Sequence, residues 1–153
     1  MYSCSCLRTK IKEGFKNSDL IFTGKVIEIN EIKMIDSIPT PNEKKKFYIR
    51  KYNRVEFKFQ IIELIKGRLN SQSVIIATSG TDEDCGNYFE LDTEHLVYSY
   101  QTDIRVNSWE ENRKIDPYYT SDICTRTDYL KYIKSREIKK LRRLAKRNNI
   151  RAI

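Results

Sequence analysis

The chain has 153 residues, 39% of them hydrophobic and 33% charged, with a formal net charge of +8 at pH 7. This length fits one domain with its own core, so residues 1–153 are treated as a single domain. The basic balance favours acidic partners, namely acidic glycans, nucleic acid or an anionic membrane surface, although a solvated basic surface without such a partner would have the same charge. No run of eighteen apolar residues occurs, so we expect no membrane span.

The cysteines are Cys4, Cys6, Cys85 and Cys124. An even number is typical of disulfides, which imply export to an oxidising compartment. A four-thiolate zinc site and free thiols are the alternatives, but zinc ligands usually come in closely spaced pairs, whereas Cys85 and Cys124 each stand alone. We therefore expect disulfides and a secreted or periplasmic protein, seen here in its mature form because no signal peptide begins the chain.

The first half of the chain predicts one helix and two strands. Residues 10–16 form a short helix with Ile11 and Phe15 on one face. Residues 20–32 form a long strand, in which Gly24 indicates a bulge or a sharp bend. Residues 34–46 contain two prolines and a lysine run, and they read as a loop.

The second half predicts further strands and a final helix. Residues 47–65 are the strongest strand, and their apolar alternation slips by one at Ile61–Ile62, which predicts a bulge. Shorter strands follow at residues 73–78, 88–91, 95–101 and 115–119, while residues 82–84 and 105–113 read as loops. Ser135 is the expected N-cap of an amphipathic helix over residues 136–148, whose narrow apolar stripe would dock on a sheet. The core is expected over residues 4–134, and the pattern as a whole predicts a mainly β chain closed into a small antiparallel barrel with helices at both ends.

The sequence contains none of the familiar catalytic motifs. Its single histidine, His95, lies in a strand without an evident catalytic partner, so we interpret it as structural or exposed. We expect a binding protein rather than an enzyme, with no cofactor, no bound metal and a monomeric state.

Two groups of cations are candidates for a polyanion-binding surface. The first is interleaved with aromatic residues on a predicted strand, and the second is the polar face of the last helix. The alternative for both is ordinary solvated surface. The residues are Lys44, Lys45, Lys46, Arg50 and Lys51 for the first group, and Lys139, Lys140, Arg142 and Arg143 for the second.

The order of several short motifs resembles a known family. The chain opens with C-x-C and a short helix, continues with "NSDLIFTGKV", a long strand ending in "KG" and a lone "CG-x-x-F", and closes with "HLVYSY", "SDICTRT" and a helix. This order resembles the netrin-like module, and within it the inhibitory domain of the tissue inhibitors of metalloproteinases. The resemblance implies a five-stranded OB-fold-like barrel flanked by amino- and carboxyl-terminal helices. It also implies two disulfides, Cys4–Cys85 and Cys6–Cys124.

The resemblance further implies a function. In the inhibitors, the amine and carbonyl of the first cysteine chelate the catalytic zinc of a metalloproteinase, and the next residue enters the specificity pocket. Carried over, this wedge would be Cys4 and Ser5, braced by Glu83 and Asp84. The expected function is therefore a secreted, non-catalytic binding module that inhibits a zinc protease. The alternative is a module that binds a heparin-like glycan or nucleic acid, or a structural interaction domain without inhibitory activity.

Overall fold

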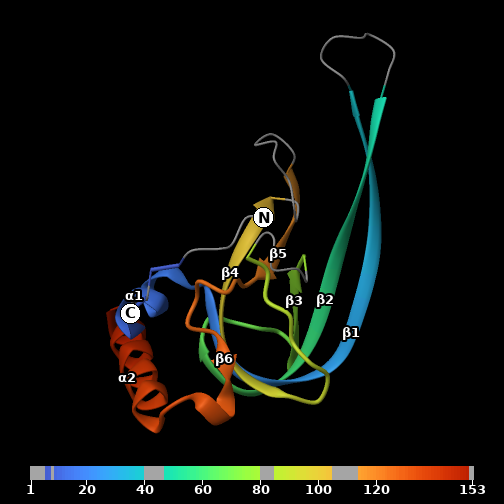
Figure 1. Ribbon diagram of the computed structural model, residues 1–153. Helices are drawn as coiled ribbons and strands as arrows, with labels where there is room; N and C mark the ends of the chain where they lie inside the picture. Colours follow the sequence, from blue (N-terminus) through green and yellow to red (C-terminus); the bar gives the residue numbers. More distant parts are fainter. Residues whose placement is uncertain (1–5, 8, 40–46, 80–84, 105–113, 152–153) are drawn as a thin grey trace.

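The computed structural model of the protein describes residues 6–7, 9–39, 47–79, 85–104 and 114–151. The prediction of a mainly β chain with helices near both ends is confirmed (Figure 1). In chain order the elements are α1 (Ile11–Asn17), β1 (Leu20–Pro39), β2 (Phe47–Lys66), β3 (Ser73–Thr78), β4 (Glu94–Ile104), β5 (Lys114–Thr120), β6 (Asp128–Tyr129), the 3₁₀ turn η2 (Leu130–Tyr132) and α2 (Ser135–Arg151).

Five strands pair in a closed ring. The hydrogen-bonded order is β1-β2-β3-β5-β4, and a further pairing of β1 with β4 joins the two ends of that order. The pairs are antiparallel except β3 with β5, which are parallel and meet at Ile76 and Tyr119. The two-residue strand β6 adds to β4 outside the ring. Each of the five strands has a partner on both sides over part of its length, and these pairings close the ring.

The strands β1 and β2 form one long hairpin that extends well beyond the ring (Figure 1). Both were predicted, but the prediction of a loop from residue 34 onwards is wrong, because β1 continues to Pro39, which pairs with Phe47. A proline at the end of a strand is compatible with pairing there, since little ladder hydrogen bonding is lost. The lysine run at residues 44–46 lies outside the described residues.

Both predicted irregularities in this hairpin are present. Thr23 pairs with Glu63 and Gly24 pairs with Ile61, so the register skips Ile62, whose side chain is 55% exposed. At Gly24 a Cβ atom would lie only 2.9 Å from the Gln60 carbonyl oxygen, so the close approach of the two backbones needs glycine. Such bulges bend a strand and increase its twist, which lets a sheet curve back on itself.

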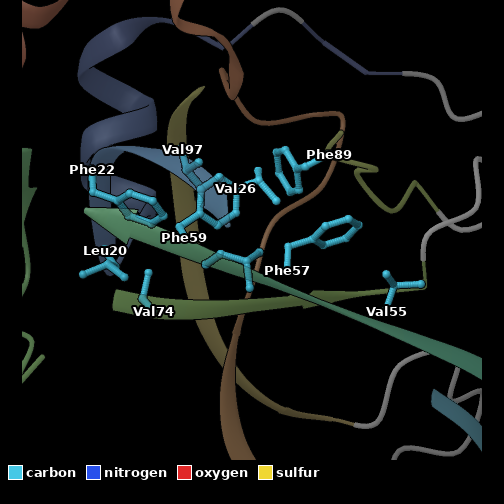
Figure 2. Close-up of a cluster of buried hydrophobic side chains, with 10 residues drawn as sticks. Leu20, Phe22, Val26, Val55, Phe57, Phe59, Val74, Phe89 and Val97 are labelled. Atoms are coloured by element: carbon cyan, nitrogen blue, oxygen red, sulfur yellow. The ribbon is translucent and has the colours of Figure 1, made fainter. Parts of the chain in front are cut away.

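The interior of the ring holds one hydrophobic cluster. Its aromatic rings meet edge to face: the Phe59 ring centroid is 5.3 Å from that of Phe22 and 5.0 Å from that of Phe89. Figure 2 shows these rings converging between the strands. The buried members are Leu20, Phe22, Val26, Val55, Phe57, Phe59, Val74, Ile76, Phe89 and Val97.

The strand predicted at residues 88–91 is wrong. Residues 87–90 have no regular secondary structure, and the nearest pairing is a single bridge between Gly86 and Asp122. Phe89 is nonetheless 2% exposed, because the irregular segment places its ring in the interior cluster. The apolar signal here therefore reflects core filling by a loop rather than a strand.

A second hydrophobic cluster lies between the outer face of the ring and the two helices. On β4, Val97 belongs to the interior cluster, whereas its neighbours Leu96 and Tyr98 belong to the second cluster. Helix α1 contributes Phe15 and α2 contributes Leu141, which is fully buried. The apolar stripe of α2 thus docks on the sheet as predicted. The helix spans Ser135–Arg151, so Ser135 is its first residue rather than the N-cap before it, and the helix ends three residues later than predicted.

Candidate functional site

The amino-terminal wedge that the resemblance implies cannot be placed, because Cys4, Ser5, Glu83 and Asp84 lie outside the described residues. The residues that would hold such a wedge are described. Cys6 forms a disulfide with Cys124, with the two Cα atoms 5.1 Å apart. This is one of the two expected pairings. Cys85, the residue expected to pair with Cys4, is not a free thiol either.

Hydrogen bonds reinforce the disulfide on both sides. Arg126 Nη1 donates to the Thr9 carbonyl oxygen at 2.8 Å, and Thr9 Oγ1 donates to the Cys124 carbonyl oxygen at 3.4 Å. The turn that carries Cys124 is itself fixed, because the Cys124 amide donates a hydrogen bond to Asp122 Oδ1 at 2.8 Å. The stretch before α1 is therefore tied to the β5–β6 connection at more than one point.

The segment that carries Cys85 lies against the same connection. The Ile123 amide donates to the Cys85 carbonyl oxygen at 2.9 Å, next to the bridge between Gly86 and Asp122. Three segments far apart in sequence, around residues 6, 85 and 123, therefore meet at one edge of the ring. We call this the clamped edge.

A cavity of about 450 Å³ adjoins the clamped edge. Its walls come from the stretch before α1, from the β5–β6 connection, and from η2 with the start of α2. The buried carboxylate of Glu137 pairs with Arg126 in this wall and so connects α2 to the connection that carries Cys124. Apolar side chains beside the disulfide face solvent, since Leu7 is 93% exposed and Ile123 is 44% exposed.

The expected polyanion-binding residues are only partly placed. Lys44, Lys45 and Lys46 lie outside the described residues, while Arg50 and Lys51 are on β2, opposite Asp36 and Ile35 on β1.

On α2, Lys139, Lys140 and Arg143 are exposed, as a solvated or binding face requires. Arg142 is exposed as well, but it also donates two hydrogen bonds of 2.7 and 2.6 Å to the Glu63 carboxylate of β2, and this contact lowers the pKa of the Glu63 carboxyl.

A basic groove between α1 and α2 was missed by reasoning from the sequence. It has a volume of about 380 Å³, and its cations come from three elements, with Lys12 and Lys16 on α1, Lys66 at the end of β2 and Arg147 on α2. The spacing of Lys12 and Lys16 places them on one face of α1, which was visible in the sequence. That α2 lies beside this face was not, because it depends on how the helices pack.

Lys66 has a structural role at the floor of this groove. Its Nζ donates to the carbonyl oxygens of Phe15 at 2.6 Å and Ser18 at 2.5 Å, and it lies 4.6 Å from the centroid of the Phe15 ring. A cation at this position satisfies carbonyls that a helix end leaves without partners and complements the helix dipole. Partial burial lowers the pKa of Lys66.

His95 is a packing residue. Its ring is 3% exposed and lies between Phe89 and Tyr129, with centroid distances of 4.9 and 4.5 Å. Its Nε2 is hydrogen-bonded to Thr93 Oγ1 at 2.7 Å. Burial lowers the pKa of His95 to about 4, so the ring is neutral at pH 7.

The described part of the chain contains neither a candidate metal site nor a membrane-spanning helix. No three His, Cys, Asp or Glu side chains gather there in a group that could hold a metal ion. None of the helices in that part is long and apolar enough to cross a membrane. No protein-family model matches the chain, and no curated protein is similar enough to count as a relative.

Proposed function

We propose that this protein is a secreted or periplasmic binding module of the netrin-like type, built on an OB-type barrel, and that it contacts a zinc metalloproteinase through its clamped edge. The observation that carries the proposal is the Cys6–Cys124 disulfide, which fixes the amino-terminal stretch to the β5–β6 connection. The five-strand ring supports the fold, since OB-type barrels are five-stranded, and the disulfide fits an oxidising compartment.

The chemistry of such a contact is direct. A catalytic zinc keeps one coordination position for water, and a neutral amine is a ligand that can displace this water and stop hydrolysis. The segment that would present the amine of Cys4 is continuous with Cys6. Because the disulfide holds Cys6 and the Arg126–Thr9 hydrogen bond holds Thr9, binding next to these residues would lose less conformational entropy. Exposed Leu7 and Ile123 would supply apolar contact beside it.

The test follows from the first three residues of the chain. Met1, Tyr2 and Ser3 precede Cys4, so the amine of Cys4 is free only if the chain is cut there. Three preparations are compared against a panel of zinc proteases: the full chain, a chain that begins at Cys4, and the latter with its amine acetylated. Inhibition by the second preparation alone is expected. Equal inactivity of all three would reject the wedge, and equal inhibition by all three would reject zinc chelation by the amine.

The basic groove supports a second candidate, binding of an acidic polysaccharide. Its cations Lys12, Lys16 and Arg147 line one cavity in a chain of net charge +8, and each that contacts an anionic group would add salt dependence to binding.

Heparin chromatography tests this candidate. The triple variant Lys12→Ala/Lys16→Ala/Arg147→Ala is compared with Lys33→Ala/Lys58→Ala/Arg68→Ala, which removes the same number of charges away from the groove. Earlier elution of the groove variant alone is expected. Equal elution of the two variants would mean that heparin binding depends on net charge and not on the groove. Retention on single-stranded DNA but not on heparin would assign the groove to nucleic acid.

A further inference from the structure

A third cavity lies where β4 meets β6 and η2. It has a volume of about 460 Å³. Tyr132 lines this cavity and also the one beside the clamped edge. Its walls are aromatic and acidic, with one cation, which sets it apart from the basic groove. The lining residues are Glu90, Thr93, Glu94, Tyr129, Lys131 and Tyr132.

Two tyrosine rings form a corner in this cavity. The ring centroids of Tyr129 and Tyr132 are 5.9 Å apart, and the ring planes meet at 79°. Tyr132 is 64% exposed, so its ring is open to solvent. The face of an aromatic ring is electrostatically negative, and two or more faces at an angle are the arrangement with which proteins surround alkylammonium groups.

The Tyr129 wall is held in place from behind. Its ring packs in a tilted arrangement against His95, with a centroid distance of 4.5 Å and an angle of 37° between the planes, and His95 in turn contacts Phe89 in the interior of the strand ring. The hydrogen bond from His95 to Thr93 fixes the histidine ring, and Thr93 Oγ1 lies 2.6 Å from the Glu90 carbonyl oxygen. A wall fixed in this way needs little rearrangement to bind a ligand.

The corner already holds a cation of the chain itself. Lys131 Nζ lies 5.3 Å from the centroid of the Tyr129 ring and 5.1 Å from that of Tyr132. These distances are within the range of a cation–π contact, about 6 Å. Because Glu90 and Glu94 line the same cavity, a cation that enters it meets carboxylates as well as ring faces.

We propose that this corner binds an alkylammonium group of a partner, and that Lys131 is an internal competitor that occupies the position when the ligand is absent. The group is the side chain of a lysine or a quaternary headgroup of the choline type, since both present a cation to ring faces. The carboxylates of Glu90 and Glu94 select against anions. Because Lys131 must leave the corner before the ligand enters, it lowers the apparent affinity for the ligand, and removing it should strengthen binding.

The experiment is a titration of the full chain followed by the amide and tyrosine-ring NMR signals of residues 129–132. The probes are choline, the amide of Nα-acetyl-lysine, whose side-chain ammonium is free, and 3,3-dimethylbutan-1-ol, which has the shape of choline without its charge. Saturable shifts with at least one of the two cations are expected, together with weaker shifts from the neutral alcohol. Preference for choline or for the lysine amide identifies the source of the group. Binding of the alcohol as tight as that of either cation would overturn the proposal, as would absence of saturation with both cations.

Three variants at two positions separate specific cation binding from non-specific binding. Lys131→Gln is expected to tighten binding of the preferred cation about fivefold, because the competitor is lost. Tyr132→Ala is expected to abolish saturation, whereas Tyr132→Phe retains it because the ring face is kept. Tyr88→Ala is the matched control, since Tyr88 is an exposed tyrosine, 54% accessible, outside this cavity. Unchanged or weaker binding by Lys131→Gln, or full binding by Tyr132→Ala, would overturn the proposal.

Discussion

Removing the Cys6–Cys124 disulfide is the most informative perturbation of the clamped edge. The double variant Cys6→Ser/Cys124→Ser keeps the size of both side chains and leaves no unpaired thiol at either position. The two residues are separated by 118 positions, so the disulfide closes most of the chain into one loop. In the chain-entropy description, a loop of that length restricts the unfolded chain by about 5 kcal/mol at 25 °C.

The measured loss should be somewhat smaller than this limit. The native structure keeps the Arg126–Thr9 hydrogen bond, which still ties the stretch to the β5–β6 connection. Unfolded chains also retain residual structure, which reduces the effect of a cross-link. We therefore expect the free energy of unfolding to fall by about 3 to 5 kcal/mol, a large part of the stability of an ordinary domain.

Urea unfolding followed by circular dichroism measures this difference. The unfolding midpoint should fall, and the amide signals of Leu7 and Thr9 should exchange faster with solvent than those of β1. The matched control is the double variant Gln72→Ser/Asn148→Ser, which introduces two serines at exposed positions and should leave the urea midpoint nearly unchanged. A loss below about 1 kcal/mol, with unchanged exchange at Leu7, would refute the view that the disulfide fixes this edge.

Three further predictions concern the core, a turn and pH. Leu141→Ala should lower the free energy of unfolding by about 2 to 5 kcal/mol, because Leu141 is the fully buried residue of α2, whereas Leu64→Ala, at a partly exposed position, should cost far less in the same urea series. Gly67→Ala should cost more than about 1 kcal/mol, because its φ is +98° and a Cβ would lie 2.8 Å from the Asp19 carbonyl oxygen; an unchanged thermal midpoint would contradict this. The pKa of His95 is lowered to about 4 in the folded protein, against about 6.5 in the unfolded chain, so the unfolded chain binds more protons between these two values. The contribution of the neutral ring to the free energy of unfolding is therefore full above about pH 6.5 and falls as the pH drops towards 4. His95→Gln should therefore be less sensitive than the wild type to a change from pH 7 to 4.5, and equal slopes would show that His95 is not the responsible group.

Local patterns in the sequence were sufficient to predict most of the strands. The bounds of β3 were predicted to the residue, because its short apolar run is framed by turn residues on the side of Gly67 and by polar residues after Thr78. The bulge at Ile62 was also visible, since a slip in a period of two changes which face is apolar. The extension of β1 to Pro39 could not be predicted, because the pairing of β1 with β2 continues through residues that lack a strand pattern of their own.

Features that require distant segments to meet were beyond reach. Phe89 fills the ring interior from an irregular segment, and the apolar residues around it suggested a strand that does not form. The basic groove combines Lys66 with cations of two helices, and the tyrosine corner combines η2 with a histidine from β4. The Cys6–Cys124 pairing was expected only through a family resemblance, because four cysteines alone permit three connectivities.

The most direct measurement is a disulfide map of the protein purified without reductant, obtained by proteolysis and mass spectrometry. Because Cys4 and Cys6 are two residues apart, we predict one assembly of three linked peptides, in which partial reduction assigns Cys6 to Cys124 and Cys4 to Cys85. Free thiols at Cys6 and Cys124 would mean that the amino-terminal stretch is not held against the β5–β6 connection, and the proposed contact edge would then be lost.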